Sequence, residues 1–225
     1  MKMWNYCTVL IIGIAVILFL SSCATPIQPH VPPTPLLSTD SARVLEARIT
    51  SQNVQVNYAW ALDKELGAFV SGNYYLSDMR GYGADAAIGR WWSGGVGRAE
   101  VYAGGGYAQT NNNADVNRTT YNLLSGFIQG NAALSTLESS AVQAQIGVAI
   151  RLSYTSLLST NYININNPAE QPDPKAIHQI TSIFLRLGYK PVAIDVGSAI
   201  MTPLSKSNLL NKPYFMMYLG CAIQM

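Results

Sequence analysis

Apolar and polar residues alternate along most of the chain after position 42. The stretch AVQAQIGVAIRLSYT, residues 141–155, has apolar side chains at every even position from Val142 to Tyr154. Successive side chains of a strand point to opposite faces, so this alternation predicts a β-strand. About ten such segments follow one another without helical periodicity. They are 43–50, 53–61, 66–76, 83–92, 98–110, 120–133, 141–155, 178–190, 192–202 and 213–224.

The lengths of the segments and of their connections favour a membrane barrel. Strands of membrane barrels need about 9 to 11 residues, whereas strands in general average about 5 or 6. Short turns such as LDKE alternate with longer connections such as TNNNADVNRT, as in outer-membrane barrels with periplasmic turns and extracellular loops. The sequence therefore predicts an all-β fold, an antiparallel up-and-down transmembrane β-barrel of about ten strands. An even strand number places both chain ends on the turn side.

The two faces of the segments indicate which side contacts lipid. Charged residues make up 12% of the chain, against about 25% in typical soluble domains. The apolar face carries no charge in its central stretches, and aromatic residues gather at strand ends, as two interfacial girdles would require. The expected girdle residues are Trp60, Trp91, Trp92 and Tyr189 by the short turns and Tyr74, Tyr75, Tyr82, Tyr107, Tyr154, Tyr214 and Phe215 by the loops. The opposite, inward face carries neutral residues such as Gln55 and Asn57. The strand charges also lie on this face, where we expect ion pairs and hydrogen bonds, with Arg151 paired to an acid from another strand. They are Glu46, Arg48, Asp85, Glu100, Arg151, Arg186 and Asp195.

The N-terminal residues predict export and a lipid anchor. The apolar run from Val9 to Leu20 is too short to span a membrane and is typical of a secretory signal. The sequence Leu20-Ser21-Ser22-Cys23 resembles the lipobox of bacterial lipoproteins, although an ordinary signal with a chance cysteine is an alternative. The resemblance implies a signal peptide over residues 1–22, a covalent lipid on Cys23 and no other cofactor. Because Ala24 does not resemble a retention signal, we expect the lipid in the periplasmic leaflet of an outer membrane.

Residues 23–41 form the predicted linker, and residues 42–225 form the barrel. Five prolines lie in this stretch without periodicity, and proline-rich chain favours an extended form of about 3.1 Å per residue. We therefore expect a tether between the lipid and the first strand. Asp40-Ser41-Ala42 resembles a glycosylation site used in Bacteroidota, which makes Ser41 a candidate, with a plain linker end as the alternative.

Several stretches together carry a resemblance to a known family. They are the lipobox cysteine with HVPPTPLL after it, VQVNYAWALDKELGAFVSGNYY, GRAEVYAGGGYAQT and the closing KPYFMMYLGCAIQM. In this pattern the chain resembles a family of small outer-membrane β-barrel lipoproteins of Bacteroidota. The resemblance implies a fold and an outer-membrane location in a Gram-negative bacterium, and it brings no catalytic residues.

The composition offers little for catalysis. The chain has 14 basic and 12 acidic residues, a balance that argues against nucleic acid as a partner. Of its two histidines, His30 lies in the linker and His178 at the loop end of the segment 178–190, and no metal-ligand spacing occurs. We therefore expect a non-enzymatic structural or accessory component of an outer-membrane complex. The expected partners are membrane lipid and other outer-membrane proteins, contacted through the barrel wall or through loop 156–177.

Three alternatives to this function stay open. A narrow pore is one, although about eight strands already give an interior filled by side chains. A small-ligand-binding barrel on a lipid tether is the second. A lipid hydrolase at the rim, built from His178, Ser182 and an inward acid, is the third. It has the weakest support, because one pair of strand positions does not show that base, nucleophile and acid meet.

Overall fold

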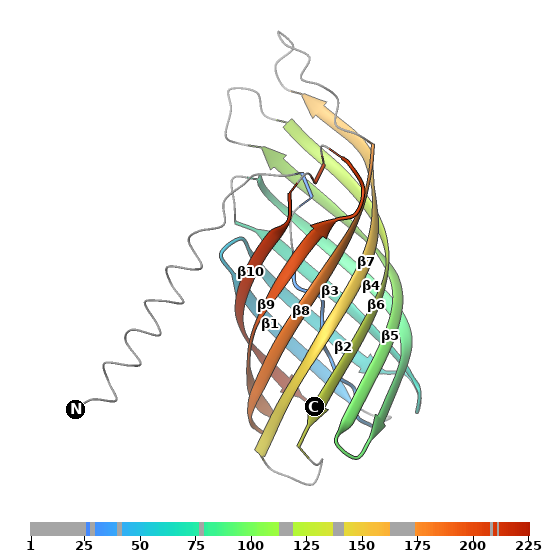
Figure 1. Cartoon of the computed structure of the whole chain (residues 1–225), viewed down its shortest axis with the longest axis vertical. Coiled ribbons are helices and arrows are strands. Elements are labelled where there is room, and N and C mark those ends of the chain that lie inside the picture. Colours follow the sequence, from blue (N-terminus) through green and yellow to red (C-terminus); the bar gives the residue numbers. More distant parts are fainter. Residues whose placement is uncertain are drawn as a thin grey trace, which may run out of the picture.

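The computed structural model is a closed barrel of ten antiparallel strands (Figure 1). It describes residues 26–27, 30–39, 42–76, 79–112, 119–136, 142–162, 174–207, 209–210 and 212–225. The strands are β1 (Arg43–Thr50), β2 (Asn53–Ala61), β3 (Leu66–Tyr75), β4 (Met79–Gly94), β5 (Gly97–Asn112), β6 (Thr119–Ser135), β7 (Val142–Tyr162), β8 (Lys175–Tyr189), β9 (Val192–Pro203) and β10 (Tyr214–Gln224). Each strand pairs with its neighbours in sequence, and β1 pairs with β10 to close the barrel. The predicted fold class is confirmed.

The strands differ from the prediction mainly in length on one side of the barrel. Strands β4 to β8 have 15 to 21 residues, more than a membrane crossing requires. The sequence prediction of a loop over 156–177 is wrong at both ends, because β7 continues to Tyr162 and β8 begins at Lys175. The continued pairing of Asn161 with Thr120 on β6 extends the strand, although Asn and Ser are more typical of loops.

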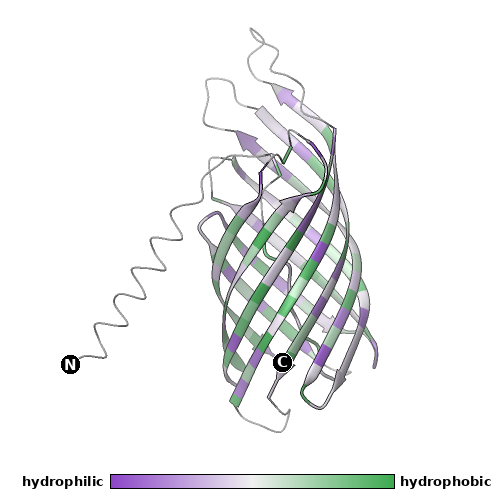
Figure 2. Cartoon of the chain, in the orientation of Figure 1, coloured by the Kyte–Doolittle hydropathy of each residue, from purple (hydrophilic) through white to green (hydrophobic). Residues whose placement is uncertain are grey.

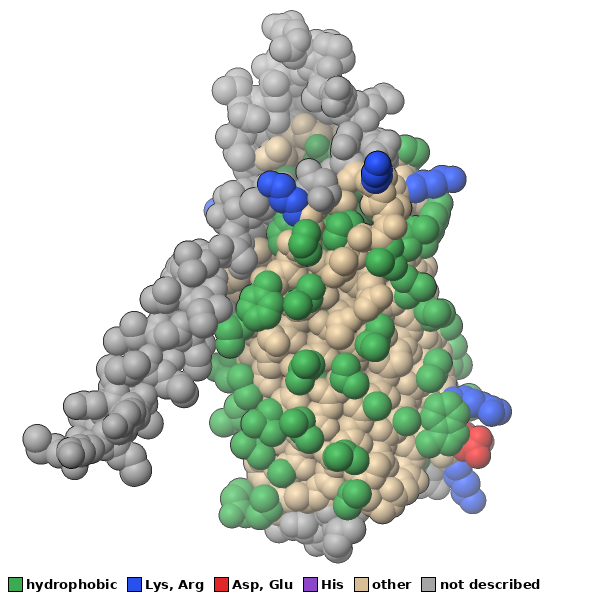
Figure 3. All heavy atoms as spheres, viewed as in Figure 1, with side chains coloured by type: hydrophobic (Ala, Val, Ile, Leu, Met, Phe, Trp, Pro, Cys, Tyr) green, Lys and Arg blue, Asp and Glu red, His purple; other side chains and the backbone are tan. Residues whose placement is uncertain are grey.

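The outer wall of the barrel is apolar between its two ends. Figure 2 shows hydrophobic and hydrophilic residues alternating along the strands. In Figure 3 the Lys, Arg, Asp and Glu side chains of the visible face gather toward the two ends, with hydrophobic side chains over the wall between them. Representative outward residues with exposed fractions of 47 to 60% are Val56, Ile88, Ile128, Ile150, Ile183 and Ile194. Such a wall suits contact with lipid rather than water. Within the described ranges, no helix is long and apolar enough to span a membrane.

The structure corrects part of the prediction of the aromatic girdles. Tyr74, Tyr82, Trp92 and Tyr154 are exposed on the outer wall, as a girdle requires. Three residues of the predicted girdles instead point inward and are buried, namely Tyr75, Trp91 and Tyr214. Each of these residues alternates in step with the inward-facing residues of its strand. Its position at a strand end alone does not reveal this.

The barrel interior contains a segment that the sequence placed outside. Residues 31–37 are all buried, and the blue trace of the N-terminal region lies within the barrel in Figure 1. The apolar side chains of Ile27, Val31 and Leu36 pack into one interior cluster, and Leu37 packs into another. The prediction of a free tether is therefore wrong for the described residues of this stretch, 26–27 and 30–39. Ten strands enclose a wider interior than the eight that side chains just fill, which leaves room for one extended chain.

Candidate functional site

The interior segment runs the length of the barrel, and we call its described residues, 26–27 and 30–39, the plug. At one end, Thr110 Oγ1 donates to the Pro26 carbonyl at 3.0 Å, close to the long connections of the barrel. At the other, Ser93 Oγ donates to the Ser38 carbonyl at 3.2 Å, close to the tight turn after β4. We call these the loop end and the turn end. The plug therefore enters at the loop end and leads into β1 at the turn end.

The proline content suits a chain that is buried without a strand partner. An extended proline-rich chain makes no hydrogen bonds of its own, and its prolines carry no N–H that burial would leave unsatisfied. Its carbonyl groups still need donors in the dry lumen. Side chains of the wall supply these donors to the plug carbonyls. The pairs are Gln55 to Val31 at 2.8 Å, Arg48 to Pro32 at 2.8 Å, Gln129 to Pro33 at 2.6 Å, Arg186 to Thr34 at 3.1 Å and Arg98 to Leu36 at 3.0 Å.

The plug changes direction at Leu36. This residue has a φ of +52°, a left-handed conformation that costs a non-glycine residue on the order of 1 kcal/mol. The hydrogen bond from Arg98 to the Leu36 carbonyl and the complete burial of the Leu36 side chain offset this cost. The bend brings the N–H of Leu37 to the Glu100 carboxylate at 2.7 Å.

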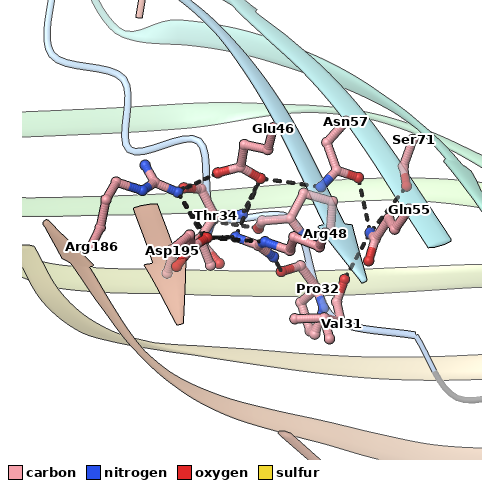
Figure 4. A network of polar contacts seen from close by, with 12 residues as sticks. Val31, Pro32, Thr34, Glu46, Arg48, Gln55, Asn57, Ser71, Arg186 and Asp195 are labelled. Atoms are coloured by element: carbon pink, nitrogen blue, oxygen red, sulfur yellow. Dashed lines mark hydrogen bonds and ion pairs between the residues drawn. The ribbon is translucent and has the colours of Figure 1, made fainter. Parts of the chain in front are cut away.

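The largest polar cluster joins two acids and two bases around Thr34 (Figure 4). Arg48 Nη2 lies 2.8 Å from Asp195 and 3.3 Å from Glu46, while Arg186 Nη2 lies 2.5 Å from Glu46 and 3.3 Å from Asp195. Thr34 Oγ1 accepts from Arg48, and the Thr34 N–H points to Glu46. All four charged side chains are at most 2% exposed. The cluster has no net formal charge, which limits the electrostatic cost of burial.

A second cluster lies nearer the loop end and contains a histidine of the plug. Arg151 Nη1 donates to Asp85 Oδ2 at 2.7 Å, which gives Arg151 the acid from another strand that the sequence required. Arg151 Nε also donates to Gln129 Oε1, and the Arg151 guanidinium carbon lies 3.9 Å from the centre of the Phe127 ring. His30 Nε2 lies 2.7 Å from Arg151 Nη1 and 3.4 Å from Asp85 Oδ2. The plug is therefore tied to this pair as well.

The structure places all seven predicted interior charges on the inward face, in three groups. The first group is Glu46, Arg48, Arg186 and Asp195, and the second is Asp85 with Arg151. Glu100 forms the third, where its carboxylate accepts from the N–H of Leu37 and from Asn131 Nδ2 at 2.8 Å. Cys23 and Ser41 lie outside the described residues.

The sequence does not predict that residues of the plug take part in each of these clusters. The sequence predicts His30 and Thr34 as linker residues and assigns no partner to the amides of Gln129 and Asn131. One signal was present, because Val31, Leu36 and Leu37 are apolar in a segment that a solvated tether would fill with polar residues. Inward amides such as Gln55 and Asn57 were recognised as lumen residues, yet nothing local showed that they would bond a backbone.

The space beside the two histidines of the interior is small. A cavity of about 40 Å³ lies beside His30, Asp85, Arg151 and His178, room for a water or two and far less than the roughly 300 Å³ of a ligand pocket. His178 and Ser182 are four residues apart on β8, or about 13 Å along a strand, and both face the interior. This pair therefore does not form the predicted hydrolase site. The described residues hold no group of three His, Cys, Asp or Glu side chains that could bind a metal ion.

These features define a transmembrane β-barrel whose lumen holds its own N-terminal segment. No protein-family model matches the chain, and no curated protein matches its sequence. It is similar to the solved structure of neisserial surface protein A, with 16% identity, a TM-score of 0.37, and coverage of 81% of this chain and 97% of that chain. LpxR from Salmonella typhimurium has 7% identity and a TM-score of 0.41, with 81% and 99% covered. The N-terminal β-barrel domain of Pseudomonas aeruginosa OprF has 11% identity and a TM-score of 0.33, with 83% and 98% covered.

Proposed function

We propose that the protein is a closed outer-membrane β-barrel lipoprotein that acts as a non-enzymatic structural or accessory component of an outer-membrane complex. The observation that carries this proposal is the plug, whose carbonyl groups are bonded to buried wall side chains along the lumen. Among the described residues, the cavity beside the plug measures about 40 Å³, far less than a ligand pocket of roughly 300 Å³. The proposal therefore ranks above the narrow pore and the small-ligand-binding barrel.

The extended strands support the accessory role. At the loop end, β5, β6 and β7 continue as a sheet whose side chains bond one another across strands. Tyr107 donates to Asn122 at 2.7 Å, Asn122 donates to Ser159 at 2.8 Å, and Thr120 donates to Asn111 at 2.7 Å. Neutral hydroxyl and amide groups of this kind suit a solvated surface. This polar sheet, together with the lipid-facing wall, is the surface that we propose for other outer-membrane proteins.

Planar-bilayer recording tests the closed barrel. We expect purified full-length protein, inserted into a lipid bilayer, to give no current steps above the background of protein-free bilayers. Insertion is checked on the lipid vesicles from which the protein is delivered to the bilayer. Protein recovered from these vesicles should migrate in its compact form in unboiled SDS. Steady ion-conducting steps from protein that has been shown to insert would overturn the proposal in favour of a pore.

A lipid assay separates this proposal from the rim hydrolase. We expect no released fatty acid when the purified protein is incubated with phospholipid or lipid A, and no difference between wild type and the His178→Ala variant. Fatty-acid release that is lost in His178→Ala would show an enzyme instead.

The lipid anchor is tested separately by metabolic labelling with palmitate, which the Cys23→Ala variant should not incorporate.

A further inference from the structure

The direction of the plug determines on which side of the membrane the chain before it lies. Ile27 donates its N–H to the carbonyl of Leu209 at 3.4 Å, and Leu209 lies in the connection between β9 and β10. Thr110, which bonds Pro26, lies three residues before the connection from β5 to β6. These two connections belong to the loop end. The first two described residues of the plug are thus fixed at that end by two different parts of the wall.

The opposite end of the plug is fixed just as firmly. Ser38 is bonded by Ser93 near the tight turn that joins β4 and β5. Thr39 accepts from the N–H of Ala42 at 3.1 Å, and Arg43 donates to the carbonyl of Met225 at 3.1 Å. The chain therefore passes once through the lumen before it enters β1. An even number of strands places the start of β1 and the C-terminus at the turn end, but it does not place Pro26 there.

Covalent geometry carries this placement to Cys23. Two residues, Ala24 and Thr25, lie between Cys23 and Pro26, and the three steps of fully extended chain from Cys23 to Pro26 span at most about 11 Å. The 12 residues of β9 measure about 40 Å along the strand. A lipid on Cys23 cannot reach the turn-end face of the membrane from Pro26, whatever path the intervening residues take. The filled lumen also offers no passage for acyl chains.

We propose that the acyl anchor of Cys23 lies on the loop side of the membrane, in the leaflet next to the long connections. This inference rests on the proposed lipidation of Cys23 and reverses the periplasmic placement expected from the sequence. Since outer-membrane barrels carry their long loops on the cell surface, the lipid would lie in the outer leaflet. The barrel must then close around a chain that is already acylated, because the lipid cannot be drawn through afterwards.

Thiol labelling of intact cells tests this placement. A Cys221→Ala background removes the exposed thiol in β10. In this background, Pro26→Cys is compared with Lys206→Cys at the loop end and Lys64→Cys at the turn end, both of which are exposed positions. The cells are a Gram-negative host that produces the full chain, and the probe is a membrane-impermeant maleimide. We expect Pro26→Cys and Lys206→Cys to react in intact cells and Lys64→Cys to react only after permeabilisation.

The outcomes separate this inference from the lipidation on which it rests. If Pro26→Cys, like Lys64→Cys, reacts only after permeabilisation, the inference is overturned. Labelling of the Cys221→Ala background that persists in the Cys7→Ala, Cys221→Ala variant would show a free Cys23 thiol and overturn the lipidation. The condition under which it reacts would still report the side of Cys23. If Pro26→Cys reacts under neither condition, an epitope inserted after Ala24 decides. Antibody binding to intact cells supports the inference, and binding only after permeabilisation contradicts it.

Discussion

Arg48 and Arg186 share the same two carboxylates in the centre of the lumen, although they lie on β1 and β8. Arg48 bonds Asp195 on β9, which is two strands away around the barrel, and Arg186 reaches across to Glu46 on β1. The period-two pattern predicted that these side chains face inward. It could not predict which of them pair, because the pairing depends on the curvature that brings distant strands together. The role of Thr34 was hidden for the same reason.

The central cluster predicts a large loss of stability when one charge is removed. We expect Arg48→Met to lower the free energy of unfolding by about 3 to 5 kcal/mol, since Asp195 and Glu46 are then left with a single base in a dry interior. The measurement is denaturant unfolding in lipid vesicles, followed by tryptophan fluorescence. Arg80→Met, at an exposed position of β4, is the control and should change stability by no more than about 0.5 kcal/mol. Equal stability of the two variants would contradict the cluster.

Gly106 provides a second prediction at this scale. A Cβ at this position would overlap the Asp85 carboxylate and lie 2.8 Å from the Ala84 carbonyl. We expect Gly106→Ala to lower the free energy of unfolding by about 1 to 3 kcal/mol through overpacking. Gly126→Ala on β6 is the matched control, because a Cβ there meets nothing within 4 Å. The idea fails if both alanine variants unfold at the same denaturant concentration.

At the level of elements, the strands were predictable and the plug was not. Residues 53–61 and 43–50 were predicted with the bounds that β2 and β1 have, because alternation is a local signal. The plug has the proline content of a solvated linker, and its partners lie on strands far away in the sequence. Whether such a chain is solvated or buried depends on the width of the barrel around it. The apolar residues of VPPTPLL, residues 31–37, were the local sign of burial.

The plug predicts a channel that opens when its packing is disrupted. Leu36 and Leu37 are 1% exposed and belong to the two apolar clusters of the interior. We expect the double variant Leu36→Asp, Leu37→Asp to conduct ions in planar bilayers, because two carboxylates are costly in apolar surroundings and would expel the segment. Leu62→Asp, at an exposed position between β2 and β3, should be as silent as wild type. A silent double variant that stays compact in unboiled SDS would contradict the prediction.

At the scale of the whole molecule, the apolar wall and the polar interior reverse the arrangement of a soluble protein. The low charge content and the neutral inward residues were enough to predict this reversal from the sequence. Strand parity places the start of β1 at the turn end, but it says nothing about a chain that passes through its own lumen. The position of Pro26 at the loop end could therefore not be predicted from the sequence.

This arrangement predicts how the protein behaves on extraction. We expect it to remain in the membrane fraction after alkaline carbonate and to need detergent for solubilisation, also in the Cys23→Ala variant, since the wall alone holds it in lipid. In unboiled SDS it should migrate faster than after boiling. Release of the Cys23→Ala variant by carbonate would indicate a soluble barrel on a lipid tether.

The most direct test of the central claim, that the barrel contains its own N-terminal segment, is photo-crosslinking from position 37. Leu37 Cδ1 lies 2.5 Å from where a Cβ of Gly67 would be, so a diazirine side chain at position 37 faces β3 directly. The account predicts intramolecular crosslinks from position 37 to the β3 peptide that contains Gly67, identified by mass spectrometry. The same side chain at the outward position Ile128 should react with lipid. Crosslinks from position 37 to lipid or to other proteins, without any to the barrel wall, would contradict the account.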